Sequence, residues 1–290
     1  MILGNHRDGW GYGAIDPSSG TAALMEMARV LGERVRAGWR PRRSIVLVSW
    51  AAQEPGLMGS WEWSMDKIHK LTHGVVAHIN MDVLVSGELL SANTSPSLKP
   101  IVLNAMKSVR SARDDKKSVY EFHQEHFDTD DLSSKVGILG SGSDHTPFAF
   151  YAGVPSIQFG YTKFKHHEGW YPPYHTGIET FYLMDKLVDP GFNSHRAATQ
   201  LGLHMILQLS EAPVLPYSLT DMTSVIEEAI TKLQNNTFVT LREHGAADSL
   251  NVMLEAFQGF RTVAEKFFEN QNVASEIPSS QSDELRYLFL

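Results

Sequence analysis

The feature that most constrains the fold is the alternation of short apolar, β-type runs with helical patterns over the first 215 residues. The runs Met1–Gly4, Ser44–Trp50 and Gly74–Met81 are typical of buried strands. A helical pattern begins at Ser18 or Ser19, between the first two runs. Strands that alternate with helices favour a parallel sheet with helices on both faces. We therefore predict an α/β domain built on a mainly parallel sheet flanked by helices.

The same reading assigns the rest of this first domain. It predicts helices over 56–70, 97–110 and 192–209, a short helix over 146–152, a strand over 154–159, and a polar surface excursion over 111–135. The pair His166–His167 reads as exposed histidines in a polar loop.

The pattern changes near Pro213–Pro216, after which only helical patterns follow. They cover residues 219–234, 239–270 and 283–290. This predicts two domains, 1–215 and an all-helical 216–290. The chain begins within an apolar run and ends on the letters DELRYLFL. We therefore expect the first domain to lack its N-terminal part and the second to be truncated.

Composition removes several classes of function. The net charge of −8, with no basic run, argues against nucleic-acid binding. The absence of cysteine excludes disulfides, thiolate zinc ligands and cysteine nucleophiles. No apolar stretch approaches the ~20 residues that span a bilayer, and Arg7 and Asp8 interrupt any signal-peptide pattern. We predict no nucleic-acid partner, no signal peptide and no transmembrane segment in this chain.

Imidazole and carboxylate side chains follow the ends of the predicted strands: His6, Asp16, Glu54, Asp82 and His175. Ligands of open parallel sheets bind beyond the carboxyl ends of the strands, so these side chains are expected at one edge. Without cysteine, they are the donors that remain for zinc. Position alone leaves calcium or magnesium open, and any one of these residues could instead be a turn or cap residue.

Five longer segments carry a specific resemblance. They are HRDGWGYGAIDPSSG (His6–Gly20), RPRRSIVLVSWAAQEPGLMGS (Arg40–Ser60), HINMD (His78–Asp82), LGSGSDHTPF (Leu139–Phe148) and YPPYHTGIET (Tyr171–Thr180). Together they resemble the glutamate carboxypeptidase II family, which includes the N-acetylated alpha-linked acidic dipeptidases and the non-enzymatic transferrin receptor. The resemblance implies a zinc aminopeptidase/carboxypeptidase-like fold and a helical dimerisation-type domain, hence a homodimer. It also implies secretion or a place on the extracellular face of a membrane.

Site roles follow from the resemblance. It implies two Zn²⁺ ions, with Asp16 bridging them, His6 and Asp82 completing one site, and Glu54 and His175 completing the other. It also implies that Asp8 orients His6 through its carboxylate.

The resemblance further implies residues that contact the substrate. Tyr174 is expected to polarise the scissile carbonyl, although a packed aromatic residue beside a loop remains the alternative. Ser141, Gly142 and Ser143 match the stretch that contacts the substrate, with Ser143 in place of the family's asparagine.

The sequence departs from active relatives at Gln53, directly before Glu54. Active relatives have a glutamate there, which serves as the general base. An amide has no basic lone pair at neutral pH, and loss of a general base typically slows a reaction by ~100- to 10,000-fold. Gln158 and Gly160 stand where paired arginines recognise acidic side chains in glutamate carboxypeptidase II, so acidic dipeptides are not expected as substrates.

Two hypotheses of different classes follow. The first is a dizinc metallo-exopeptidase that cleaves a peptide bond near the C-terminus of small peptides, with activity impaired by Gln53. The alternative is a non-catalytic metal-binding receptor or dimerisation module like the transferrin receptor. Whether the chain is an enzyme is left open by the sequence, because an alternative base could replace the missing glutamate.

Overall fold

The computed structural model describes residues 1–164, 170–245 and 247–275. It divides into two compact units, Met1–Ala212 and Pro213–Leu290. The predicted helix at 283–290 and the pair His166–His167 lie outside the described residues.

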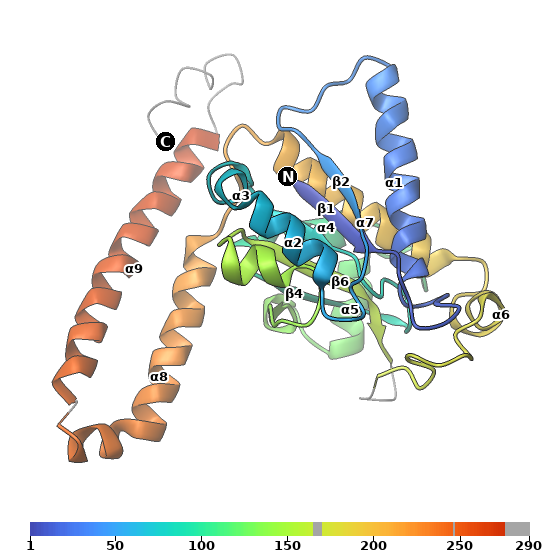
Figure 1. Cartoon of the computed structure of the whole chain (residues 1–290). Helices are drawn as coiled ribbons and strands as arrows, with labels where there is room; N and C mark the ends of the chain where they lie inside the picture. Colours follow the sequence, from blue (N-terminus) through green and yellow to red (C-terminus); the bar gives the residue numbers. More distant parts are fainter. Residues whose placement is uncertain (165–169, 246, 276–290) are drawn as a thin grey trace. The chain divides into compact units, whose positions relative to one another are not determined.

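A six-stranded sheet forms the centre of the first unit (Figure 1). Its order is β2-β1-β3-β6-β4-β5. The strands are β1 (Ile2–His6), β2 (Val46–Trp50), β3 (His78–Asn80), β4 (Leu89–Thr94), β5 (Gly137–Ile138) and β6 (Ser156–Lys163). Every pair is parallel except β4 with β6. The prediction of a mainly parallel sheet flanked by helices is therefore confirmed.

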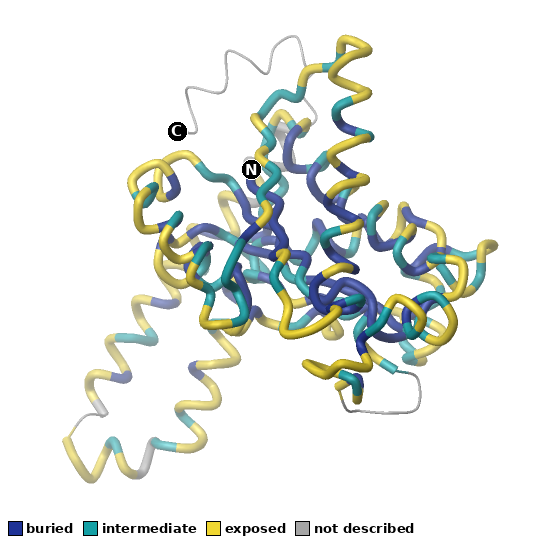
Figure 2. The backbone as a smooth tube through the Cα atoms, turned by 45° about the vertical axis from the view of Figure 1, so that its right-hand side comes forward, coloured by how far each residue is buried: buried dark blue, intermediate teal, exposed yellow. Residues whose placement is uncertain are grey.

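Helices cover the sheet. The buried residues concentrate in the strands and on the sides of the helices that pack against the strands (Figure 2). The longer helices are α1 (Ser18–Arg36), α2 (Met58–Asp66), α3 (Ile68–Gly74), α4 (Lys99–Ser108), α5 (Val119–Phe127) and α7 (Asn193–Glu211). Short helical turns are α6 (Phe181–Leu183), the 3₁₀ turns η1 (Pro96–Leu98) and η2 (Ser133–Lys135), and the π-helical turns η3 (Pro147–Tyr151) and η4 (Met184–Val188).

The structure differs from the predictions in several elements. The predicted helix over 56–70 is two helices, α2 and α3, which meet at Lys67. The predicted surface excursion over 111–135 contains α5, because Ser118 and Glu121 form a capping box and His123 is buried. The antiparallel strand β4 was not predicted, since its letters LLSANT lack a long apolar run.

Close packing of α1 against the sheet brings the segment before that helix to the strand ends. A side chain at Gly20 would collide with the carbonyl oxygen of Met81 and come within 2.6 Å of that of Asp82. Glycine therefore permits this approach. Asn5 fixes it further, because its side chain accepts a hydrogen bond from the Thr21 hydroxyl of α1 at 2.5 Å and its amide donates to the carbonyl oxygen of Met81 at 2.6 Å.

The second unit contains two long helices, α8 (Leu219–Glu243) and α9 (Ala247–Ser275), which contact each other. Ser218 caps α8 by accepting a hydrogen bond from the Asp221 N–H at 3.0 Å. Among the described residues, no helix is both long and apolar enough to span a bilayer.

Candidate metal centre

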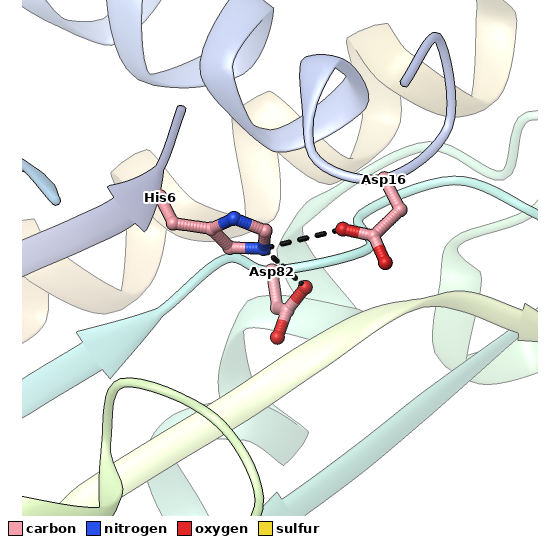
Figure 3. Close-up of side chains that lie close together, drawn as sticks. All are labelled: His6, Asp16 and Asp82. Atoms are coloured by element: carbon pink, nitrogen blue, oxygen red, sulfur yellow. Dashed lines mark hydrogen bonds and ion pairs between the residues drawn. The ribbon is translucent and has the colours of Figure 1, made fainter. Parts of the chain in front are cut away.

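Two groups of potential ligands share Asp16. In the first, which we call the His6 group, His6 Nε2 lies 3.2 Å from Asp16 Oδ1 and 3.0 Å from Asp82 Oδ1 (Figure 3). In the second, the His175 group, His175 Nε2 lies 3.3 Å from Asp16 Oδ2 and 3.0 Å from Glu54 Oε2. The two oxygens of one carboxylate therefore face two different histidines.

The donor atoms fit two cations. Within each group the candidate ligand atoms lie within 4.8 Å of one another. Glu54 Oε1 is buried and has no hydrogen-bond partner among the described residues. Burial of a carboxylate oxygen without a donor is unfavourable, so this oxygen is suited to a cation. Imidazole nitrogen with carboxylate oxygen is a donor set that zinc accepts.

The electrostatics of the His6 group favour positive charge. Burial lowers the pKa of His6, but Asp16 and Asp82 raise it more, to about 11. Burial and the charge of Asp16 raise the pKa of Glu54. The carboxylates thus repel one another and attract any cation placed between them.

The register of the strands positions the His6 group. Ile2 and Gly4 of β1 pair with His78 and Asn80 of β3, so the ends of these strands lie side by side. His6 is the last residue of β1, and Asp82 follows β3 by two residues. The ligands on neighbouring parallel strands are therefore adjacent in space.

Asp8 contacts both His6 and the loop that carries Glu54. The ring Nδ1 of His6 lies 2.9 Å from the backbone carbonyl oxygen of Asp8 and 3.8 Å from its carboxylate. A hydrogen bond from Nδ1 to that carbonyl leaves Nε2 free as a ligand. The carboxylate of Asp8 instead accepts the backbone N–H groups of Gln53 and Glu54, each at 3.1 Å. Asp8 therefore holds the loop that carries Glu54.

Tyr174 lies on the exposed side of the His175 group. Its ring stacks on His175 with ring centroids 3.6 Å apart, and the residue is 42% exposed. Burial and the nearby carboxylates raise the pKa of Tyr174 to about 12. Its hydroxyl therefore stays protonated at neutral pH and can donate a hydrogen bond.

Ser143, an expected substrate contact, forms hydrogen bonds with Asn80 and with Asp82 of the His6 group. It is 2% exposed, and its hydroxyl donates to Asp82 Oδ2 and accepts from Asn80 Nδ2 at 2.8 Å. Ser143 therefore holds a metal-ligand candidate in place. Ser141 and Gly142, by contrast, are exposed.

Gln158 and Gly160 both lie on β6. Gln158 is half-buried, whereas Gly160 is fully enclosed. A side chain at Gly160 would come within 2.6 Å of the carbonyl oxygen of Val83. The backbone therefore leaves no room for an arginine at this position.

One buried acid at the site was missed by the sequence reasoning. Glu179 is 3% exposed and binds the backbone of both Asp16 and His175. Its only sequence signal is its place in the segment YPPYHTGIET, four residues after His175.

Comparison with known proteins agrees with this geometry. A mainly parallel sheet with imidazole and carboxylate donors at its edge is the arrangement of a metal-dependent hydrolase. Residues 1–188 match the model of Peptidase family M28, and the chain belongs to this family.

Curated relatives cover most of the chain. The chain is 36% identical over 272 residues to the Aminopeptidase NAALADL1 of Rattus norvegicus, covering 91% of the chain and 36% of that protein. It is 38% identical over 236 residues to a Probable glutamate carboxypeptidase VP8 of Zea mays, covering 80% of the chain and 31% of that protein. The chain thus spans about a third of the length of the curated relatives it matches.

Solved structures share the fold. A zinc aminopeptidase from Bacillus subtilis, BSAP, aligns with a TM-score of 0.52 at 22% identity, over 72% of this chain and 46% of that one. LapA of Legionella aligns with a TM-score of 0.50 at 19% identity, over 72% and 52% of the two chains.

Proposed function

We propose that this chain forms the α/β part of a dizinc peptidase whose turnover is impaired. His6, Asp16 and Asp82 would hold one zinc ion, and Asp16, Glu54 and His175 the other. The observation that carries the proposal is the placing of the two oxygens of Asp16 against two histidines, at 3.2 and 3.3 Å. Bound zinc supplies Lewis acidity, which activates a water and polarises a peptide carbonyl.

The chain's own residues divide the remaining tasks. The Tyr174 hydroxyl, held protonated, would donate to the carbonyl oxygen of the scissile bond. Gln53 occupies the position of the general base, and its side chain makes no hydrogen bond to another described residue. An amide can hold a water but cannot accept its proton, so turnover would be ~100- to 10,000-fold below that of a glutamate-bearing site.

For substrate, we propose small uncharged peptides cleaved near the C-terminus. Relatives named glutamate carboxypeptidases support the C-terminal cleavage, whereas the rat relative is named an aminopeptidase. The neutral Gln158 and the enclosed Gly160, at the positions of the arginine pair, argue against a substrate with an acidic side chain.

Gln53 also favours a second candidate, a non-catalytic metal-binding module. In either case we propose that the helical unit, Pro213–Leu290, contributes to a homodimer. We also propose secretion or an extracellular membrane-bound location. Both of these proposals rest on the resemblance to glutamate carboxypeptidase II.

The test is zinc content by mass spectrometry together with hydrolysis of a mixed dipeptide library. The native chain, Gln53→Glu and the control Gln258→Glu, on the exposed surface of α9, are measured side by side. Two zinc ions per chain with strong activity only in Gln53→Glu support an impaired peptidase. Zinc without turnover in any variant favours the non-catalytic module. Full activity in the native chain contradicts the role given to Gln53.

A further inference from the structure

Glu179 is a buried carboxylate with no part in the proposed chemistry. It lies two residues before α6 and is 3% exposed. Such burial is unfavourable for a carboxylate unless several donors satisfy its oxygens. The identity of those donors shows what the residue does.

The donors come from two distant parts of the chain. Glu179 Oε1 accepts the backbone N–H of Asp16 at 3.0 Å and the hydroxyl of Tyr171 at 2.9 Å. Glu179 Oε2 accepts the backbone N–H of His175 at 3.3 Å. The backbone adds a further link, because the N–H of Ala14 donates to the carbonyl oxygen of Glu179 at 3.0 Å. The side chain of Glu179 thus links the backbone of Asp16 to the backbone of His175.

The backbone of His175 needs such support. Its φ of +59° lies in the left-handed region, which is unfavourable for a residue with a side chain. Residues hold such conformations only where surrounding contacts fix them. The bond from the His175 N–H to Glu179 is one of these contacts.

The chemistry of the contacts calls for a carboxylate. Three donors point at its two oxygens, and an ionised carboxylate offers only acceptors. A glutamine has one oxygen, so its amide N–H₂ would face at least one N–H or O–H donor. A glutamine would therefore match the size of Glu179 but could not accept all of its hydrogen bonds.

We propose that Glu179 is a positioning residue of the metal centre, which sets the separation of Asp16 and His175 and thereby the zinc affinity of the His175 group. This inference rests on the proposed metal centre. It assigns Glu179 no contact with zinc or with substrate.

The test compares Glu179→Gln with Tyr171→Phe, which removes a single donor, and with the control Glu62→Gln on the exposed face of α2. Zinc affinity is measured by chelator competition, and the d–d absorption spectrum of the cobalt-loaded chain reports the ligand geometry. We expect Glu179→Gln to weaken the zinc of the His175 group by ~10- to 100-fold and to shift the cobalt spectrum. Tyr171→Phe should have a smaller effect in the same direction, and Glu62→Gln none.

Hydrogen exchange on the metal-free chain separates this inference from the proposed function. Glu179→Ala should speed amide exchange at both Asp16 and His175, although the two residues lie 159 positions apart in the sequence. Folding of each variant is checked by circular dichroism. A folded Glu179→Gln with native zinc affinity and native cobalt spectrum overturns the inference, as does unchanged exchange at Asp16 in Glu179→Ala. If the native chain binds no zinc, the proposed metal centre fails, and faster exchange in both segments would still establish the tie between them.

Discussion

The two halves of the candidate metal centre differ in burial and in what supports them. The side chain of His6 is 1% exposed, whereas that of His175 is 31% exposed. His6 and Asp82 stand at the ends of adjacent parallel strands, whereas Glu54 and His175 stand on loops. Strand pairing fixes His6 through the backbone ladder, and Asp82 follows β3 by two residues. The second pair depends on the carboxylates of Asp8 and Glu179, which bind loop N–H groups.

This difference separates a buried, strand-held half from an open, loop-held half. Ligands on strands are placed more rigidly than ligands on loops, and the open half is the one that Tyr174 adjoins. The half that Tyr174 adjoins is thus also the half whose geometry can be changed by single side chains outside the ligand set.

The largest expected effect comes from the residue that the halves share. Asp16→Asn keeps the size of the side chain but removes the charge that faces both histidines. We expect both zinc sites to weaken by more than the ~100-fold typical of losing an outer partner of a ligand. Zinc per chain after dialysis is the measurement, with Asp66→Asn on the exposed face of α2 as the control. Retention of two zinc ions by Asp16→Asn would contradict the bridge.

The next prediction separates the halves. In the metal-free chain, His6→Ala leaves two carboxylates buried without their partner, which typically lowers stability by ~3–5 kcal/mol. His175→Ala also removes a partner of two buried carboxylates, but His175 itself is 31% exposed and water can take its place, so we expect a loss below ~3 kcal/mol. Urea unfolding in the presence of a chelator measures both changes in the free energy of unfolding. Equal losses for the two variants would remove the distinction between a buried half and an open half.

The approach of α1 to the sheet should matter mainly for the buried half. Gly20→Ala places a methyl group against the carbonyl oxygens of Met81 and Asp82. Overpacking of this kind typically lowers stability by ~1–3 kcal/mol. We expect the zinc of the His6 group to weaken as Asp82 is displaced. Gly38→Ala is not a suitable control because its φ of +100° adds strain, whereas Gly259→Ala on α9 meets open space. An unchanged urea midpoint in Gly20→Ala would show that the helix shifts freely.

The sequence predicted the two halves unequally. The runs that became β1, β2 and β3 are apolar and β-branched, so their ends, and the ligands that follow them, could be placed in advance. The five ligand candidates came from motifs in which residue type and order are visible. The supports of the open half were not visible, because Glu179 meets Asp16 only through the tertiary fold. The contact of Ser143 with Asp82 was not visible in the sequence for the same reason, since the two residues lie 61 positions apart.

The last prediction concerns a buried histidine in the core of the sheet. His78 on β3 stacks on Phe148 at 4.1 Å, and neither ring nitrogen has a hydrogen-bond partner among the described residues. Burial lowers the pKa of His78 to about 3. In the unfolded chain the ordinary value is about 6.5, so below that pH the unfolded state gains a proton that the folded state does not hold.

Lowering the pH from about 6.5 to 3 should therefore lower the free energy of unfolding by ~1.4 kcal/mol for each pH unit. This slope comes from His78 alone. Burial likewise lowers the pKa of His123, to about 4, and this residue adds a second slope of the same sign. Urea unfolding at pH 5 and 6 compares the native chain with His78→Leu and with the control His69→Leu on the exposed face of α3. His78→Leu should remove the contribution of His78 to the pH dependence. His69→Leu should remove no contribution, because the exposed imidazole of His69 is not kept neutral by the fold. If His78→Leu leaves the pH dependence unchanged, the imidazole of His78 takes up a proton in the folded chain, and burial in the sheet does not keep it neutral.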